Sequence, residues 1–176
     1  MQPALAPRDY RPTLISRRGE LIAWISFLLV GVTWVILIIV GQRYCLAVPV
    51  LAIILLLASL SISLGNWMDR HTVLYISEEN VTYRNGIRNL EISWEKIQEV
   101  QVLPAQWGKK VHVLADQAHF HYQMLGEVKV HGEVKGQVGF AEGDLILDEI
   151  IKRSKLHEIQ PPEQDQAETG VYYARE

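Results

Sequence analysis

Two uncharged apolar runs, Leu21 to Val40 and Leu46 to Leu64, constrain this chain more than any other feature. At about 1.5 Å of helical rise per residue, each run can cross the roughly 30 Å hydrocarbon layer of a bilayer. Lipid offers no hydrogen-bond partner to a backbone, so both runs are predicted to be helices despite their Val and Ile content. The short connection Gly41 to Cys45 predicts an antiparallel hairpin over 21–65. Pro49 falls near the first turn of the second helix, where a missing N–H is tolerated.

Two alternative interpretations of the apolar runs are disfavoured. A secretory signal peptide would explain Arg17 and Arg18 before the first run, but that run is longer than a typical cleaved segment. Glu20 also stands where an apolar residue would be expected, and a second full-length run follows at once. A buried hairpin in a soluble core is disfavoured because the remaining chain is too short to cover two helices that are apolar all round. The prediction is an integral membrane protein.

Arginine residues are distributed unevenly around the hairpin. Four precede the first run, Arg43 alone lies in the connection, and Arg70 follows the second run. The positive-inside rule then places the N-terminal segment 1–20 and the chain after the hairpin in the cytoplasm, at the inner membrane. Neither run contains Asp, Glu, Lys, Arg or His, which argues against an ion or proton pathway. Cys45 is the single cysteine, so an intramolecular disulfide and a Cys-rich zinc site are excluded.

Small residues are spaced along the second apolar run. Ser59 and Ser63 lie one helical turn apart, and Ala52 and Ala58 are nearby. Such side chains let helix backbones approach closely in a membrane. We therefore expect this side of the helix to pack against the first helix of the hairpin or against a second copy of the chain.

From Val73 onward, continuous apolarity gives way to alternation of apolar and polar residues, which predicts strands with one buried face. Asn85-Gly86 is a strong signal for a tight hairpin turn. A final amphipathic helix is predicted from Asp144, its expected cap, with apolar residues along one side at Leu147, Ile150 and Ile151. About seven antiparallel strands are expected, near 73–77, 80–85, 88–94, 98–103, 109–115, 118–124 and 127–140, and the last of these segments can be split into two strands.

The segment 157–176 differs in composition from the strands before it. It contains Pro161-Pro162 and several Gln and Glu residues, with almost no apolar periodicity. Such a sequence cannot bury enough apolar surface to offset the entropy of ordering. It is predicted to be a disordered tail.

The stretches Leu74 to Arg84 and Leu90 to Val100 resemble the first hairpin and the strand-into-turn pattern of the bacterial pleckstrin-homology-like (PH-like) membrane protein family. The resemblance covers 70–156. It implies a bent, partly open β-barrel of about seven strands with a C-terminal capping helix, used as a binding or scaffolding module. Eukaryotic phosphoinositide binders of similar fold carry Lys and Arg in the first hairpin turn, whereas Ser77-Glu78-Glu79-Asn80 would repel a phosphate. Lipid recognition at this turn is therefore not expected.

Metal-binding and catalytic patterns are weak. His119 and His121 alternate on one strand face, and His112 or His131 could approach them. No cysteine participates, and polar residues on an outward strand face are usually solvated, so no metal site is predicted. The chain lacks a nucleophile elbow, a phosphate-binding glycine loop and a His-Glu helix motif. Its paired carboxylates lie in a turn and near a helix start, where acidic residues are common for structural reasons. Neither enzymatic activity nor a cofactor is predicted.

One cluster of cationic and aromatic residues, formed by Trp107, Lys109 and Lys110, is a candidate contact with the membrane surface or a partner. The mildly acidic charge from Asp69 to Gln160 argues against nucleic acid as a partner. The predicted function is a non-catalytic interaction or scaffolding module, anchored in the inner membrane, that presents its cytoplasmic β domain to a protein partner or to a second copy. A regulatory accessory subunit acting through the hairpin, and a domain that binds the lipid surface, are the alternatives.

Overall fold

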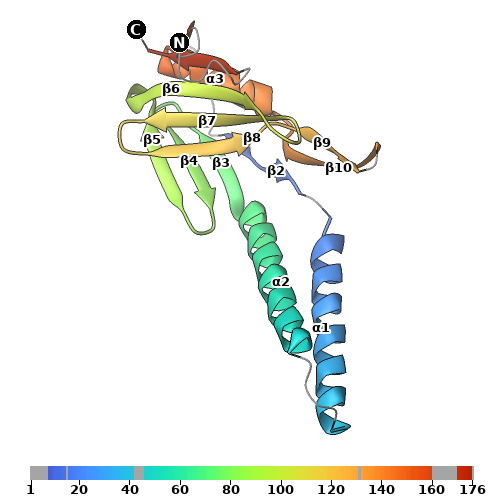
Figure 1. Cartoon of the computed structure of the whole chain (residues 1–176). Helices are drawn as coiled ribbons and strands as arrows, with labels where there is room; N and C mark the ends of the chain where they lie inside the picture. The colour runs from blue at the N-terminus through green and yellow to red at the C-terminus, as the bar shows by residue number, and fades with distance from the viewer. Residues whose placement is uncertain (1–7, 15, 42–45, 131, 160–169, 176) are drawn as a thin grey trace. The chain divides into compact units, whose positions relative to one another are not determined.

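The structure, a computed structural model, describes residues 8–14, 16–41, 46–130, 132–159 and 170–175. Contacts divide the chain into a helical unit, 16–68, and a mostly β unit formed by 1–15 together with 69–176 (Figure 1). The predicted combination of two long apolar helices with a β-rich part and one further helix is confirmed at this level.

The helical unit is an antiparallel pair, α1 (Arg18–Ile39) and α2 (Ala47–His71), and both helices are long and apolar enough to cross a membrane. They lie side by side, and no residue of α1 is buried, whereas Ala52 and Ser59 of α2 are (Figure 1). The predicted boundary at Leu64 is too early. Polar residues continue the helix to its end, where Arg70 and His71 suit the negative pole of the helix dipole. Most of the connection, including Cys45, lies outside the described residues.

The first sheet of the β unit begins as soon as α2 ends. Strands β3 (Thr72–Ile76), β4 (Asn80–Asn85) and β5 (Asn89–Ser93) form an antiparallel meander. The predicted turn at Asn85-Gly86 joins β4 to β5, and Gly86 adopts φ 81°, the region that favours glycine. The Asn85 side-chain oxygen accepts a 2.8 Å hydrogen bond from the Arg88 backbone N–H and so stabilises that turn.

The remaining predicted strands form the other two sheets. A short 3-10 turn, η1 (Trp94–Lys96), leads into the second meander. The sheets formed by the described strands are open and do not close into a barrel. The strands are β6 (Ile97–Pro104), β7 (Lys109–Ala115) and β8 (His119–Gln123), followed by the hairpin β9 (Gly126–Val130) and β10 (Glu133–Phe140). The expected split of segment 127–140 is thus observed.

The core of the β unit is built from the inward-facing positions of β3 to β8 and from the last helix, α3 (Gly143–Ser154). Ile146, Leu147 and Ile150 on one side of α3 belong to this core, as the helical spacing predicts. The predicted cap is wrong: α3 begins at Gly143, and Asp144 lies in its first turn. The other core residues are Leu74, Ile76, Val81, Ile92, Trp94, Ile97, Val100, Val102, Val111, Val113, Phe120, Tyr122, Met124, Phe140 and Leu156.

The prediction that 157–176 is wholly disordered is wrong. Strands β11 (His157–Ile159) and β12 (Val171–Ala174) pair with each other, and β12 also pairs with β6. Tyr172 is 1% exposed. Arg175 donates to the carbonyls of Glu95, Trp94 and Ser154 at 2.7, 3.2 and 3.0 Å. An unpaired edge of β6 is a template for a short β-forming segment, and this explains why four residues pair there despite the polar sequence before them.

The N-terminal segment 1–20, for which the sequence predicted only a cytoplasmic location, contributes two strands to the β unit. Strand β1 (Arg8–Tyr10) pairs with β3, and β2 (Pro12–Thr13) pairs with β10. The final residues, 18–20, belong to α1. The β unit is therefore assembled from chain on both sides of the helical hairpin, and the hairpin is an insertion within it.

Candidate functional site

The predicted cluster of Trp107, Lys109 and Lys110 does not form one surface patch. Trp107 lies in the turn between β6 and β7, and its carbonyl oxygen accepts a hydrogen bond from the Gln123 side chain. Lys109 and Lys110 are neighbours in β7, so their side chains leave opposite faces of the strand. Contact of this cluster with a membrane or partner stays a prediction, but Lys110 has a second role because it lines a pocket.

This pocket, the junction pocket, lies where all three sheets of the β unit meet. Its volume is about 210 Å³. Its lining combines ionisable, hydroxyl-bearing and aromatic side chains, which is the composition of a site that orients a small polar ligand. The lining residues are Pro12, Thr13, Asp69, Thr72, Tyr83, Lys110, His121, Tyr122, Gln123, Val138, Gly139 and Phe140.

Strand register places the polar wall of the junction pocket. Lys110 of β7 is the cross-strand partner of Gln123 of β8, and His112 is the partner of His121. Cross-strand partners share a face, so these four side chains project away from the core that Val111 and the other inward residues fill. The sequence pattern therefore predicts their common face correctly, although it does not predict that a pocket lies beside it.

Burial and charge shift two titratable groups at this wall. Partial burial lowers the pKa of the His121 imidazole, and the nearby Lys110 ammonium lowers it further. His121 is therefore neutral at pH 7. Burial also raises the pKa of the Tyr83 phenol, against hydrogen bonds from the Asn85 and Thr72 side chains that lower it. Both groups can donate and accept hydrogen bonds near neutral pH.

Gly139 closes the wall formed by β10. A Cβ atom there would lie 2.4 Å from the Met124 carbonyl oxygen, and Gly139 has φ 103°. Only glycine allows β10 to approach β8 this closely with that backbone conformation. Phe140, next to it, is 3% exposed and packs edge-on against Tyr122, with ring centroids 5.7 Å apart. The back of the pocket is thus closely packed and apolar.

Two of the histidines considered for a metal site, His112 and His121, lie next to each other. The rings of His112 and His121 lie 5.5 Å apart, centroid to centroid. No group of three or more His, Cys, Asp or Glu side chains within the described residues is arranged to hold a metal ion. His131 lies outside those residues.

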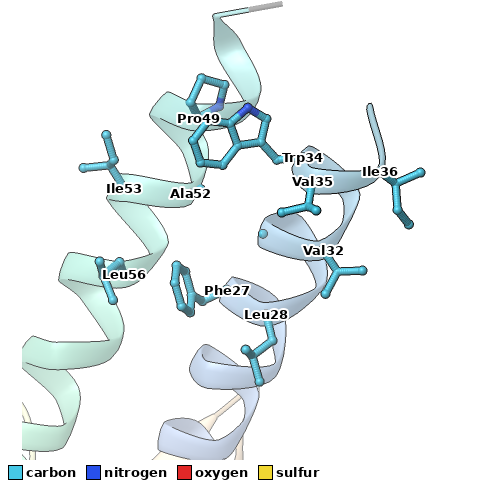
Figure 2. Close-up of a pocket in the computed structure, with 11 residues that line it drawn as sticks. Phe27, Leu28, Val32, Trp34, Val35, Ile36, Pro49, Ala52, Ile53 and Leu56 are labelled. Carbon is cyan, nitrogen blue, oxygen red and sulfur yellow. The ribbon is translucent and has the colours of Figure 1, made fainter. Parts of the chain in front are cut away.

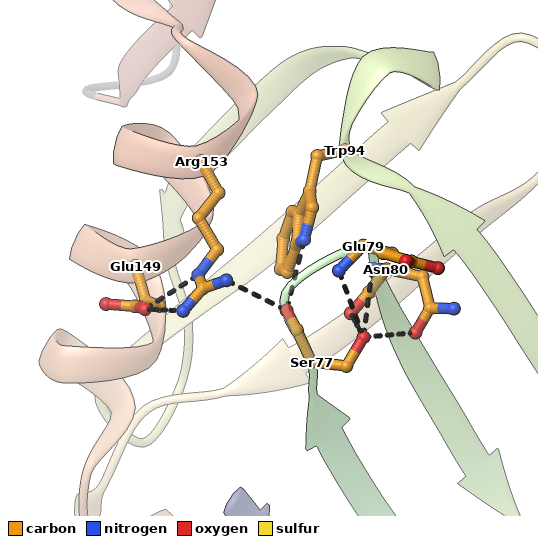
Figure 3. Close-up of polar contacts among 6 residues, drawn as sticks. All are labelled: Ser77, Glu79, Asn80, Trp94, Glu149 and Arg153. Atoms are coloured by element: carbon orange, nitrogen blue, oxygen red, sulfur yellow. Dashed lines mark hydrogen bonds and ion pairs between the residues drawn. The ribbon is translucent and has the colours of Figure 1, made fainter. Parts of the chain in front are cut away.

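The acidic turn between β3 and β4 is held by a polar network (Figure 3). The Ser77 hydroxyl donates to Asn80, and it accepts from the Asn80 backbone N–H at 3.0 Å. The Ser77 carbonyl accepts hydrogen bonds from Trp94 Nε1 at 3.2 Å and from the Arg153 guanidinium at 3.0 Å. Arg153 is paired with Glu149, at 2.6 Å, and lies 5.7 Å from the centroid of the Trp94 ring. This network fixes the turn to α3, so it has a structural role.

A cavity of about 670 Å³ adjoins this network and includes both turn glutamates in its lining. Two of its cations, Arg153 and Arg175, already contact carbonyl oxygens. Three glutamates, Glu78, Glu79 and Glu95, face the same space. These carboxylates would repel a phosphate, although Lys155 also lines the cavity, and the absence of lipid recognition at this turn stays a prediction.

In the helical unit, a polar clamp joins the two helices. The Ser63 hydroxyl accepts from Trp24 Nε1 at 2.9 Å and donates to the Glu20 carboxylate at 2.9 Å. Asn66 donates to the other Glu20 oxygen at 3.0 Å. Ser63 was expected to serve as a small packing residue and instead makes interhelical hydrogen bonds, while Ser59 and Ala52 are buried as expected.

An apolar cleft of about 540 Å³ opens between α1 and α2 (Figure 2). Trp34 and Phe27 of α1 face Pro49 and Leu56 of α2 across it. The Trp34 indole nitrogen is buried and has no hydrogen-bond partner among the described residues. The cleft is therefore apolar apart from one unsatisfied donor.

Sequence reasoning missed Asp69, Thr72 and Tyr83 as pocket residues. Asp69 had one signal, because it is the first acidic residue after the second apolar run. Thr72 and Tyr83 gave none, because strand alternation does not show which sheets meet. No protein-family model, no curated protein and no solved structure matches this chain.

Proposed function

We propose that this chain is a non-catalytic binding module, anchored in the bacterial inner membrane by its hairpin, that presents a PH-like β domain to a protein partner in the cytoplasm. One observation carries the proposal: both ends of the hairpin run directly into strands of the same β unit. Residues 14–17 alone separate β2 from α1, and no residue separates α2 from β3.

These short connections determine on which side of the membrane the two ends of the hairpin emerge. Strands that precede α1 and strands that follow α2 pair within one folded unit, so both ends of a membrane-spanning hairpin must emerge on the same side. Arginines concentrated before α1 favour the cytoplasmic side. Seven residues, Gly65 to His71, lie between the apolar run and β3, which keeps the β unit close to the headgroups.

The order of elements supports the PH-like part of the proposal. A three-stranded meander, β3 to β5, is followed by a second, β6 to β8, and later by the helix α3, which packs on the core. This is the order that the resemblance of residues 70–156 implies. The additional strands β1, β2, β11 and β12 extend the sheets beyond it.

The edge of β5 is the surface proposed for the protein partner. β5 ends the first sheet and pairs with β4 alone among the described strands, so its outer backbone groups can accept an added strand. A cavity of about 310 Å³ lies beside it, with Glu91 and Asp116 in its lining. Glu95 follows β5, and Lys96 is the one cation among the described residues that line the cavity. Carboxylates outnumber cations here, which favours an extended basic segment of a partner.

Affinity capture of the membrane-extracted full chain tests this proposal. A stoichiometric protein partner, or a second copy of the chain, should be recovered. Charge reversal on β5, Glu91→Lys, should weaken recovery, whereas Glu158→Lys on the exposed strand β11 should leave it unchanged. Repeated recovery of the chain with no stoichiometric partner would contradict the proposal.

The hairpin cleft favours a second candidate function, that of an accessory subunit acting through its helices. A membrane helix of another protein could fill the cleft and supply an acceptor for the Trp34 indole N–H. Replacing α1 and α2 by an unrelated hairpin separates the two functions. Retained partner recovery favours the β domain, and lost recovery favours the helices.

A further inference from the structure

The junction pocket contains two opposite charges that do not neutralise each other. Lys110 of β7 and Asp69 near the end of α2 both line it. No ion pair within 4.0 Å joins their side chains, and neither side chain has a hydrogen-bond partner in the described part of the chain. A cation and an anion held apart at one small cavity are complementary to a ligand that carries both charges.

The size of the pocket limits that ligand. A dry cavity of about 150 Å³ is enough for benzene, which has six non-hydrogen atoms, so the 210 Å³ here can hold a ligand of about eight non-hydrogen atoms. An ammonium and an oxyanion connected through two carbons fit this limit. Free amino acids and ethanolamine phosphate belong to this class.

The remaining polar groups suit the same ligand. Thr13 and the neutral His121 can donate to an oxyanion or accept from an ammonium. The ionised Asp69 carboxylate can only accept hydrogen bonds, which favours a primary ammonium over a quaternary one, because a quaternary ammonium has no N–H to donate. The closely packed apolar wall at Phe140 leaves the polar side as the place for both charged ends.

We propose that the junction pocket binds a small zwitterion, with Lys110 binding its oxyanion and Asp69 binding its primary ammonium. The favoured source is the ethanolamine phosphate headgroup of an aminophospholipid. The lipid source rests on the proposed function, because only an anchored β unit stays within reach of headgroups. The zwitterion chemistry itself does not depend on it.

Calorimetric titration of the full chain in phosphatidylcholine nanodiscs tests the zwitterion chemistry. The probes are O-phosphoethanolamine, which carries both charges, and glycerol 3-phosphate, which lacks the ammonium. Asp69→Asn should weaken binding of O-phosphoethanolamine at least about tenfold and spare glycerol 3-phosphate, a difference that misfolding cannot produce. Lys110→Met should weaken the binding of both probes about tenfold, and Lys110→Arg should restore their binding. Lys109→Met and Glu78→Gln, outside the pocket, are matched controls expected to behave as the unmodified chain.

Native mass spectrometry of the chain from nanodiscs with equal phosphatidylcholine and phosphatidylethanolamine identifies the source. Retention of phosphatidylethanolamine that Asp69→Asn abolishes assigns the pocket to the lipid. Binding of O-phosphoethanolamine without lipid preference assigns it to a soluble zwitterion. A membrane-extracted chain that binds neither probe at millimolar concentration overturns the inference, whereas a chain that does not fractionate with membranes overturns the proposed function instead.

Discussion

The hairpin and the β unit are both rich in apolar residues, but they place those residues in opposite ways. In the β unit, apolar side chains from strands and from α3 converge on one core. In the hairpin, α1 buries no residue and α2 buries only Ala52 and Ser59 among those described. Apolar composition alone therefore does not create a core. The β unit excludes water from its core by its own packing, whereas the hairpin leaves most of its large apolar side chains uncovered by its own contacts.

The same substitution in the two regions should show this difference most clearly. Ile146 of α3 is 0% exposed, so Ile146→Ala should lower the free energy of unfolding of the β unit by about 2–5 kcal/mol. Ile54 of α2 is 56% exposed, and Ile54→Ala should change stability by less than about 0.5 kcal/mol. Denaturant unfolding of the full chain in detergent measures both. Leu145→Ala, at the exposed neighbour of Ile146, is the control, and equal losses at 145 and 146 would refute the assigned core.

Removing the C-terminal strand should have the next largest effect. Truncation before Gly170 removes the buried Tyr172 ring, the pairing of β12 with β6 and the bonds of Arg175. We expect a loss of about 2–4 kcal/mol, mostly from the lost burial and the unsatisfied carbonyls. Thermal unfolding followed by near-ultraviolet circular dichroism measures it. A truncated chain as stable as the full chain would mean that the tail is disordered after all.

Within the hairpin, only substitutions at the contact between the two helices should be destabilising. Ser59 and Ser61 both donate to the carbonyl four residues before them, but Ser59 is fully buried and Ser61 is exposed. Ser59→Leu should overpack the contact, with a cost of about 1–3 kcal/mol, and should push α1 and α2 apart. Ser61→Leu should be tolerated. Distances between spin labels on α1 and α2 measure the separation, and an unchanged distance in Ser59→Leu would contradict the packing.

The smallest expected effect is a pH dependence confined to the β unit. The folded chain holds the pKa of His121 below the ordinary value of 6.5, so the unfolded chain binds this proton more readily. Stability from this group is therefore complete above about pH 6.5 and falls as the pH drops through the lower, folded pKa. The melting temperature should fall between pH 7.5 and 5.5, and less so in His121→Gln. The melting temperature of His157→Gln, on the exposed strand β11, should fall as much as that of the unmodified chain. An equal fall in the melting temperature of His121→Gln would refute the assignment.

The sequence predicts local structure well and assembly poorly, and the difference has a physical cause. Strand 80–85 and the Asn85-Gly86 turn depend on alternation and turn chemistry, which neighbouring residues determine, and both are confirmed. Strands β1 and β12 contain only three and four residues, and each is ordered because a distant strand offers a free edge. Their formation depends on tertiary pairing, which no local pattern reports.

The candidate site shows the same division between features that neighbouring residues determine and features that depend on tertiary assembly. The outward face shared by Lys110 and His121 follows from alternation along β7 and β8. The pocket itself requires β2, β3 and β10 to meet that face, and these strands are far apart in the sequence. The opposing charge of Asp69 enters from the end of a helix that was expected to stop at Leu64.

The central claim is that the hairpin spans the bilayer and returns the chain to the side on which the β unit folds. The native Cys45, between the two helices in the sequence, provides a direct test. A membrane-impermeant maleimide should label Cys45 in sealed right-side-out vesicles. In a Cys45→Ser background, Lys109→Cys should be labelled only after permeabilisation. Labelling of both positions from the same face of sealed vesicles would contradict the claim.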